Sequence, residues 1–237
     1  MKLTVTSVAS RAGDPHPINE DRYLCEPELQ LFAVLDGEVH EGYAAEVASA
    51  TFGAHLRRDR GGRALTPADL VDAVEAANRA VFAAASVPRW RGCGTTLTCC
   101  AASNTTLHMA HVGDSRLYHL SGQSWRLVTR DHSLVEDYRR CGRDAEIEEL
   151  ATVHSNVITR ALGFAPEVSV DTVSIELSPG DCVVLCTDGA WRPFDPRLAG
   201  APPPTTETGR VLERIFERYT LDGERDNATA LVVSVGP

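Results

Sequence analysis

Acidic residues stand repeatedly at the ends of apolar, strand-like segments of this sequence. The acids in such positions are Asp21, Asp36, Asp114, Asp188 and Asp226. Strand ends can converge at one end of a sheet sandwich, where carboxylates without a countercharge would repel one another and take up protons. Hard divalent cations would turn the same group into a binding site, because Mg²⁺ and Mn²⁺ prefer carboxylate, carbonyl and water oxygens. The pattern therefore indicates a candidate metal site.

Glycine follows two of these acids, in Asp36-Gly37 and Asp188-Gly189. A residue without a Cβ lets the backbone approach closely, so the carbonyl of Gly37 could reach an ion. An isolated Asp-Gly pair is equally typical of an ordinary turn. The metal-site hypothesis therefore depends on the acids occurring together and in order.

The elements that would position the acids are both strands and helices. Apolar runs predict strands at 3–8, 31–35, 95–102, 105–112, 116–120, 125–129, 168–177, 182–186 and 228–235. The runs between 95 and 129 are expected to form consecutive antiparallel strands. Three helices are expected. One begins at Gly42, one begins at Thr66-Pro67 with Thr66 as N-cap and Pro67 as the first helical residue, and one begins at Thr208. Strands in hairpin order with helices grouped between them predict an α+β fold with antiparallel sheets.

Composition limits the class of protein. The chain has 237 residues, 43% of them hydrophobic, and we expect one catalytic domain over residues 1–237. Acidic residues outnumber basic ones by 33 to 23, which argues against nucleic acid as a ligand. No apolar run approaches the roughly 18 residues of a membrane span, and the first residues resemble a strand more than a signal peptide. Cysteines in odd number, without zinc-like spacing, indicate free thiols in a reducing cytoplasm. We also expect a monomer with no membrane partner.

Short motifs follow one another along the chain in the order NED, VLDG, GTT with HVGDSR, TRDHSL, NVITRALG, PGDCVVLCTDG and DNAT. In this order, and over essentially the whole chain, they resemble the metal-dependent protein phosphatases, which are type 2C serine/threonine phosphatases, in their bacterial branch. The resemblance implies an α-β-β-α sandwich of two antiparallel sheets flanked by helices. It also implies a centre of two or three Mn²⁺ or Mg²⁺ ions that activates water to hydrolyse phosphoserine and phosphothreonine.

The resemblance implies roles for the residues that match these motifs. Asp36 would bridge two ions, with the carbonyl of Gly37 beside it. Asp188 and Asp226 would ligate one of the two ions. Asp36 is accordingly a catalytic candidate as well as a ligand.

Other residues that match the family motifs would complete the metal centre. Asp21, directly, and Glu20, through water, would serve the other side, and Asp21 is a second catalytic candidate. Asp114 matches the position that, with Asp188, holds a third ion in bacterial members. Residues 132–156 match a mobile flap near the substrate.

The segment expected to grip the substrate phosphate departs from the family pattern. The family usually has Arg three residues before the Asn of NED, and this chain has His16 there. A bidentate guanidinium is replaced by an imidazole whose charge depends on pH. His16 and Arg22 are therefore the substrate-binding candidates, with Arg11 as another cation that could compensate.

Two loops after the Asp-Gly pairs also depart from the pattern. The bacterial DGMGGH-like loop is replaced by DGEVHEG at 36–42, in which His40 could protonate the leaving oxygen as a general acid. After Gly189 the sequence continues AWRP, where the family usually has Leu, Thr or Ser, and Asp. The metal ligands are thus complete, while the predicted phosphate pocket is altered.

Three other interpretations remain open at this point. The altered pocket would suit a phosphatase of the same fold that acts on a small phosphorylated metabolite rather than on a phosphoprotein. It would also suit a catalytically impaired, phosphatase-like binding module. A serine hydrolase could be argued from Gly113-Asp114-Ser115, but the GDSGG and GxSxG contexts are absent. Metal-dependent turnover of p-nitrophenyl phosphate distinguishes an enzyme from a binding module.

Overall fold

The computed structural model describes residues 2–14, 18–38, 42–58, 62–122, 124–143, 147, 154, 157–194, 210–222 and 226–236. The described strands form two five-stranded sheets and one short two-stranded sheet, and neighbouring strands are antiparallel in all three. The first sheet has the order β1-β12-β11-β8-β9, with β1 at Leu3–Arg11, β12 at Ala228–Val235, β11 at Cys182–Cys186, β8 at Arg116–Ser121 and β9 at Ser124–Leu127. The second has the order β10-β7-β6-β3-β2, with β10 at Asp171–Glu176, β7 at Thr106–Val112, β6 at Leu97–Ser103, β3 at Leu31–Leu35 and β2 at Arg22–Glu26.

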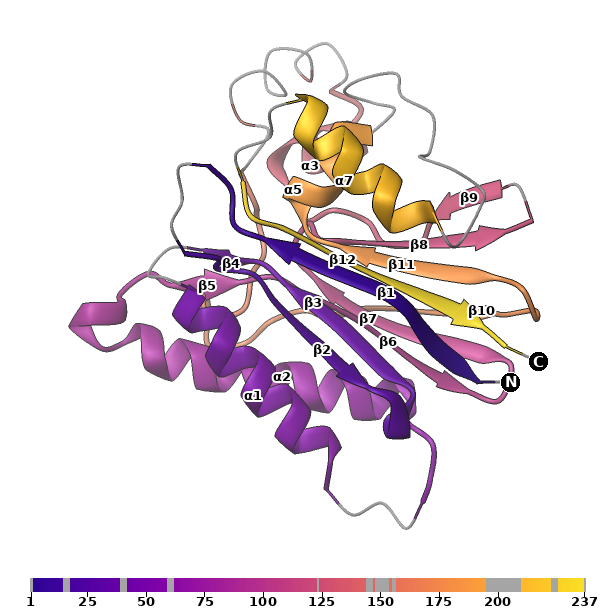
Figure 1. The fold of residues 1–237 in the computed structure, drawn as a ribbon. Coiled ribbons are helices and arrows are strands. Elements are labelled where there is room, and N and C mark those ends of the chain that lie inside the picture. Colours follow the sequence, from indigo (N-terminus) through magenta and orange to yellow (C-terminus); the bar gives the residue numbers. More distant parts are fainter. Residues whose placement is uncertain are drawn as a thin grey trace.

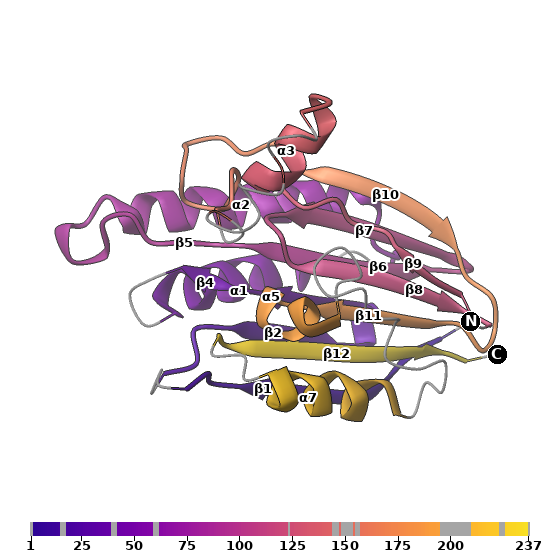
Figure 2. The ribbon, with the colours of Figure 1, turned by 90° about the horizontal axis from the view of Figure 1, so that it is seen from above.

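Helices cover the outer faces of both sheets (Figures 1 and 2). The second sheet is covered by α1, Tyr43–Leu56, and α2, Pro67–Ala85. The first sheet is covered by α5, Asp188–Trp191, and α7, Val211–Asp222. The remaining short elements are α3 at Leu134–Arg140, the strands β4 at Gly37–Glu38 and β5 at Gly94–Thr95, and the 3₁₀ turns η1 at Pro27–Leu29, η3 at Pro88–Trp90 and η4 at Arg192–Phe194. The α-β-β-α sandwich that the family resemblance implies is therefore confirmed.

Alternating side chains of single strands supply three separate apolar layers. On β3, Leu31, Ala33 and Leu35 pack under α1 and α2, whereas Phe32 and Val34 point into the space between the sheets. Successive residues of a strand face opposite sides, so a continuous apolar run serves two layers at once. The same division on β12 places alternate residues against α7 and against the second sheet. Strands that are buried on both faces therefore lack polar alternation in their sequences.

Helix α2 begins as its sequence predicts. The Thr66 hydroxyl accepts a hydrogen bond from the Asp69 N–H at 3.3 Å, and the Asp69 carboxylate accepts one from the Thr66 N–H at 2.8 Å. This reciprocal capping satisfies donors that the first helical turn leaves without partners. Pro67 adds a fixed φ at the first helical position.

One expectation about strand pairing was wrong. The strands between residues 97 and 127 do not form one consecutive antiparallel set, because β7 and β8 belong to different sheets. The chain crosses between the sheets at Gly113, whose φ of +111° favours glycine and where a Cβ would lie 2.5 Å from the Thr96 side chain. The crossover leaves Asp114 between the two sheets rather than at the tip of a hairpin.

The structure bears on two further expectations, which concern the state of the cysteines and the presence of membrane-spanning helices. All of the cysteines are free in the structure, as expected, and burial raises the pKa of Cys99 and of Cys182 to about 12. Such thiols are poor nucleophiles near neutral pH. Among the described residues, no helix combines the length and apolar character needed to cross a bilayer.

Candidate metal centre

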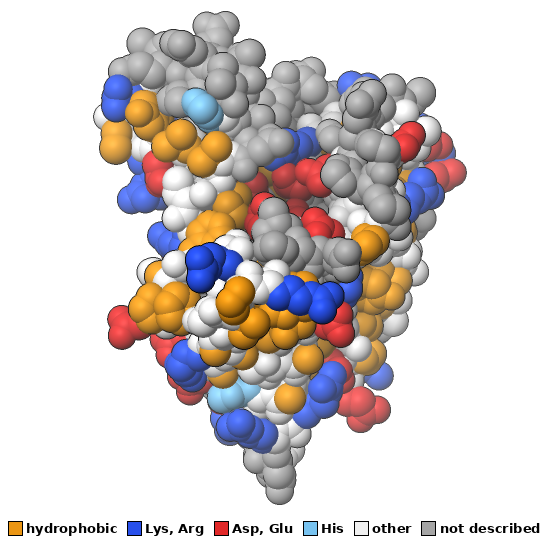
Figure 3. Space-filling model, turned by 90° about the vertical axis from the view of Figure 1, so that its left-hand side faces the viewer, with side chains coloured by type: hydrophobic (Ala, Val, Ile, Leu, Met, Phe, Trp, Pro, Cys, Tyr) orange, Lys and Arg blue, Asp and Glu red, His pale blue; other side chains and the backbone are white. Residues whose placement is uncertain are grey.

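The acids singled out in the sequence come from different elements and meet at one end of the sandwich. Figure 3 faces the end that carries β4 and β5, and shows acidic side chains gathered in a hollow of the surface with basic side chains nearby. The elements contribute them at strand and helix ends: Asp21 before β2, Asp36 after β3, Asp114 between β7 and β8, Asp188 at the start of α5, and Asp226 before β12. Asp21 and Asp114 are only 3% and 4% exposed.

Hydrogen bonds to two threonines fix the backbone of Asp36. Its N–H donates to Thr96 Oγ1 at 2.9 Å, and its carbonyl accepts bonds from the Thr96 N–H at 2.9 Å and the Thr95 hydroxyl at 2.7 Å. The Thr96 hydroxyl also lies 2.8 Å from Ser115 Oγ. These bonds join three of the motifs and hold the end of β3 independently of the Asp36 side chain.

Asp21 is oriented from the opposite sheet. The Thr187 hydroxyl donates to Asp21 Oδ2 at 2.8 Å, and the Thr229 N–H donates to Thr187 Oγ1 at 2.9 Å. The Asp21 N–H donates to Asn19 Oδ1 at 3.0 Å. One oxygen of the carboxylate is thereby held in place, and its direction is set before any ligand binds.

Close backbone contacts bring the remaining motifs together. A Cβ at Gly37 would lie 2.5 Å from the Glu20 carbonyl oxygen, and one at Gly189 would lie 2.2 Å from the Asn227 carbonyl oxygen. The Glu20 N–H donates to Asn227 Oδ1 at 2.7 Å, and Glu20 Oε1 accepts a bond from the Gly42 N–H at 3.1 Å. Only glycine permits this proximity at both Asp-Gly pairs.

Burial and mutual repulsion disfavour the charged forms of these acids. Burial raises the pKa of Asp36 well above its usual range, and the charges of Asp188 and Asp21 raise it further. Burial, assisted by Asp188, raises the pKa of Asp21 to about 7 despite hydrogen bonds to threonines. Burial and Asp188 likewise raise the pKa of Asp114. The cluster therefore carries more negative potential than its own fold neutralises.

The donor set fits a hard divalent cation. Asp21 Oδ1 and Asp188 Oδ1 are buried and accept no hydrogen bond from any described residue. Among the described residues, no three His, Cys, Asp or Glu side chains form a ready cation-binding group. Oxygen donors, buried lone pairs without partners and raised carboxyl pKa values are nevertheless the features that Mn²⁺ or Mg²⁺ would satisfy.

Comparison with known proteins decides the family. The pattern described as Protein phosphatase 2C matches residues 18–227. The chain belongs to the protein phosphatase 2C family. That match includes all of the predicted ligand acids.

Solved and curated members of the protein phosphatase 2C family resemble this chain to different extents. The serine/threonine phosphatase PstP/Ppp of Mycobacterium tuberculosis has a TM-score of 0.83 and 30% identity, with all of both chains covered. The catalytic domain of the serine threonine protein phosphatase PstP in complex with two manganese ions has a TM-score of 0.80 and 28% identity, covering 100% of this chain and 99% of that one. The serine/threonine phosphatase Stp of Listeria welshimeri is 37% identical over 98 residues, which are 41% of this chain and 39% of the relative. The chain thus spans about two fifths of the length of such curated relatives.

Glu38 belongs to the same carboxylate cluster, although the sequence pattern did not identify it. Burial raises its pKa to about 7, and the charges of Asp188, Asp226 and Glu20 contribute in the same direction. Glu38 lies in β4, two residues after Asp36, and it replaces the Met of the DGMGGH-like loop. The substitution of an acid for an apolar residue beside a candidate ligand was the available signal.

A buried aromatic and ionic group supports the side of the cluster near Asp114. The Trp191 indole N–H donates to the Asp114 carbonyl at 3.0 Å. The guanidinium of Arg116 lies 3.3 Å from the centre of the Trp191 ring. Arg116 also makes a bidentate pair with Asp131, at 2.9 and 2.6 Å. Residues of three separate motifs therefore position the backbone of Asp114.

Replacing Asp131 with Ala should destabilise the protein by about 3–5 kcal/mol, because it leaves the Arg116 charge buried without its carboxylate. Glu217→Ala is the matched control, since Glu217 pairs with Arg214 at 2.8 Å where both side chains are 45% exposed. The control should cost about 1 kcal/mol or less. Urea unfolding measures both. Equal effects of the two substitutions would contradict a structural role for the buried pair.

His132, at the start of the predicted flap, is tied to the sandwich. Its Nδ1 accepts a bond from the Gly113 N–H at 2.9 Å, which leaves Nε2 to face Asp171 at 3.2 Å. Arg160 bonds to Asp171 at 2.8 Å. Burial lowers the pKa of His132, and Arg160 contributes to the same shift. The flap therefore begins from a fixed point, while 144–146, 148–153 and 155–156 lie outside the described residues.

The predicted substrate contacts are only partly within the described structure. Arg22 Nη1 donates to the carbonyls of Asn19 and Asp21, both at 2.8 Å, and Nη2 lies 3.7 Å from Glu46. The guanidinium thus braces the NED segment next to the cluster. His16 and His40 lie outside the described residues, so their predicted roles stay predictions.

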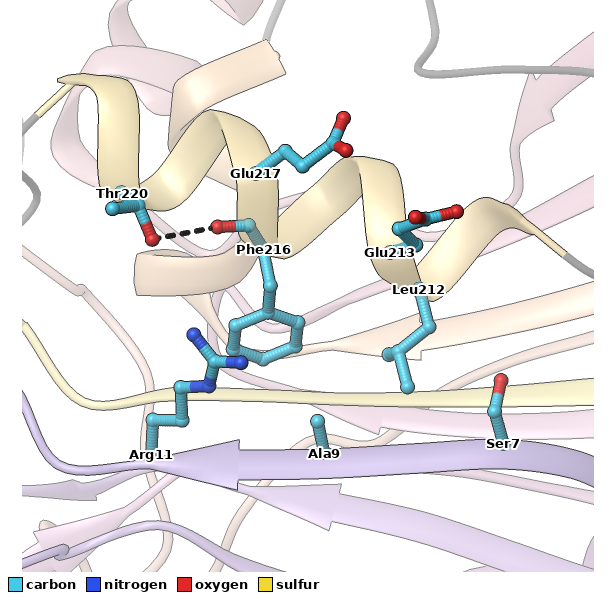
Figure 4. A pocket seen from close by; sticks show the side chains of 8 residues that line it. All are labelled: Ser7, Ala9, Arg11, Leu212, Glu213, Phe216, Glu217 and Thr220. Carbon is cyan, nitrogen blue, oxygen red and sulfur yellow. Dashed lines mark hydrogen bonds between the residues drawn. The ribbon is translucent and has the colours of Figure 1, made fainter.

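A second hollow lies away from the acids. An open groove of about 770 Å³ runs between β1 and α7, where Arg11 packs over the Phe216 ring at 4.6 Å (Figure 4). Its lining contains Glu213 and Glu217 but none of the cluster acids. The groove is therefore separate from the candidate metal centre, which lies in the hollow at the end of the sandwich.

Proposed function

We propose that this chain is a metal-dependent phosphomonoester hydrolase, acting as a serine/threonine protein phosphatase through a binuclear Mn²⁺ or Mg²⁺ centre. The observation that carries the proposal is the buried carboxylate cluster, whose pKa values are raised and whose Asp21 Oδ1 and Asp188 Oδ1 lack partners among the described residues. Membership in the protein phosphatase 2C family supports it.

Individual residues have distinct proposed roles at the ions. Asp36 would bridge two ions beside the Gly37 carbonyl, and Asp188 and Asp226 would ligate one of them. When bound, the ions supply the charge that makes water a nucleophile near neutral pH and that offsets charge on the phosphoryl oxygens. Because hydrolysis by water needs no covalent phosphoenzyme, the buried cysteines have no required role.

The other side of the centre orients water and substrate. Asp21 would act there directly and Glu20 through water, with the Thr187 bond holding Asp21 in one direction. Asp114 is proposed as a further acid facing the cations. His40 would protonate the leaving oxygen, and His16 and Arg22 would contact the phosphate.

Two substrate classes can be separated by one assay. Phosphoserine and phosphothreonine peptides should be hydrolysed with Mn²⁺ present, and p-nitrophenyl phosphate should report the same chemistry without peptide contacts. A parallel panel of small phosphorylated metabolites tests the alternative substrate class suggested by the altered loops. Activity toward metabolites with none toward peptides would contradict the protein phosphatase assignment. Mn²⁺ binding without turnover of either panel would support the impaired binding module instead.

His16→Arg should lower KM for phosphopeptides by about tenfold, or roughly 1–2 kcal/mol, with kcat little changed. The reason is that a guanidinium offers a bidentate, pH-independent contact where imidazole offers one hydrogen bond. Steady-state kinetics from pH 5.5 to 8 measure the effect, with His16→Ala as the comparison. An unchanged KM in both variants would show that His16 does not contact the phosphate.

The cellular setting is proposed on the same basis. We infer a cytoplasmic bacterial enzyme, active as a monomer, whose residues 1–237 form a single catalytic domain. The excess of acidic over basic residues, 33 to 23, argues against nucleic acid as a partner. Gel filtration at micromolar concentration tests the monomer, for which a dimeric elution volume would be contrary.

A further inference from the structure

Arg192 places a positive charge inside the carboxylate cluster. It opens η4, directly after α5, and its Nη2 lies 2.6 Å from Asp188 Oδ2. The two side chains are only 12% and 11% exposed. A guanidinium this deeply buried is directed toward the acids rather than toward solvent, because an isolated buried charge would be costly.

The charge of Arg192 reaches other acids of the cluster as well. It lowers the pKa of Asp114 and of Glu38, against the upward shifts that burial and Asp188 produce in both. The same cation therefore acts on Asp188, Asp114 and Glu38, which come from three different elements. This is the pattern expected of a shared countercharge, not of a single surface ion pair.

The backbone around Arg192 holds it in this position. The preceding Trp191 is fixed by its bond to the Asp114 carbonyl at 3.0 Å and by the Arg116 guanidinium stacked on its ring. The following Pro193 accepts a bond from Arg218 of α7 at 3.2 Å. Anchors on both sides of Arg192 keep its guanidinium at the cluster.

Two departures from the family pattern thus meet in space. Arg192 occupies the place where the family usually has Asp, and Glu38 occupies the place of an apolar residue. We infer that Arg192 stands in for one divalent ion beside Asp114 and Asp188, so that this centre binds two ions and not three. The inference rests on the proposed metal centre.

Occupation and repulsion both favour this stoichiometry. Asp188 Oδ2 already has a cationic partner at 2.6 Å, so it is not a vacant ligand for a further ion on that side. A divalent ion beside Asp114 would also be repelled by the guanidinium across a poorly solvated space. The ions at Asp36, Asp21 and Asp226 do not require displacement of Arg192.

Counting bound Mn²⁺ tests the inference without reference to activity. Native mass spectrometry and calorimetric titration of the wild-type chain should give two ions. Arg192→Ala and the similarly sized Arg192→Gln should give three, whereas Arg192→Lys, which keeps the charge, should give two. Arg214→Ala is the control, since Arg214 is an exposed arginine of α7 and should leave the count at two.

Thermal unfolding of the EDTA-treated proteins supplies a second readout. Arg192→Gln should melt roughly 5 °C below wild type, because the acids lose their shared countercharge, and added Mn²⁺ should reduce the difference. Three ions bound to wild type would overturn the inference while leaving the metal centre intact. Two ions in Arg192→Gln together with an unchanged metal-free Tm would also overturn it. A wild-type chain that binds no Mn²⁺ would contradict the metal centre itself.

Discussion

Asp36→Asn should abolish most Mn²⁺ binding and lower kcat on the order of 10³-fold, while the metal-free protein keeps its fold. Asp36 is the proposed bridging ligand, so one neutral amide removes charge from both ion positions. The backbone bonds to Thr95 and Thr96 do not involve the side chain and would persist. Loss of one of several mutually repelling carboxylates should leave the metal-free protein as stable as wild type or more so.

Calorimetry with Mn²⁺ and circular dichroism measure the two halves of this expectation. Asp72→Asn is the matched control, because it makes the same chemical change at an exposed residue of α2. The control should keep both metal binding and activity. An unchanged Mn²⁺ affinity in Asp36→Asn would sink the ligand assignment, and an unfolded variant would show that Asp36 has a structural role as well.

The metal-free protein should lose stability as the pH rises from about 6.5 to 8. The pKa values of Asp21 and Glu38 are raised to about 7, and those of Asp36 and Asp114 lie well above their usual range. A raised folded pKa means that the native state holds more protons than the unfolded chain, so stability falls as pH rises through the folded value. The expected loss is roughly 2–4 kcal/mol over this interval.

The lower limit of this interval is set by a group that acts in the opposite direction. Burial lowers the pKa of His111 to about 3, so its contribution to stability grows with pH until the unfolded imidazole is neutral, near 6.5. Above that pH the carboxylates dominate. Urea unfolding in EDTA should therefore show the decline between pH 6.5 and 8, a smaller one for Glu38→Gln, and little or none with Mn²⁺ bound. A metal-free protein whose stability is constant or rises over this interval would contradict the electrostatic description of the cluster.

The sequence predicted the buried strands well because their residues serve two layers. The bounds of β3, β11 and β12 agree with the continuous apolar runs at 31–35, 182–186 and 228–235. A strand that is buried on both faces has no polar alternation, so it appears in the sequence as a continuous apolar run. The acids at the ends of these strands were predictable for the same reason, since each one stands next to a continuous apolar run.

The assignment of strands to the two sheets and the charge balance within the cluster could not be predicted from apolar runs. The switch of sheet at Gly113 depends on the contact with Thr96, which is distant in sequence. Glu38 and Arg192 lie in short, irregular segments without apolar periodicity, and their significance depends on neighbours contributed by other elements. Both positions were visible as departures from the family pattern, but only the fold shows that they face the same acids.

The most direct test of the proposed metal centre follows ion binding and catalysis in one titration. Metal-free protein would be titrated with Mn²⁺ while bound ions and hydrolysis of a phosphothreonine peptide are measured together. We expect no hydrolysis in EDTA, activity that rises in step with ion binding, and loss of both signals in Asp36→Asn. Peptide hydrolysis that persists in EDTA would contradict a metal-dependent phosphatase, as would full Mn²⁺ binding that never produces turnover.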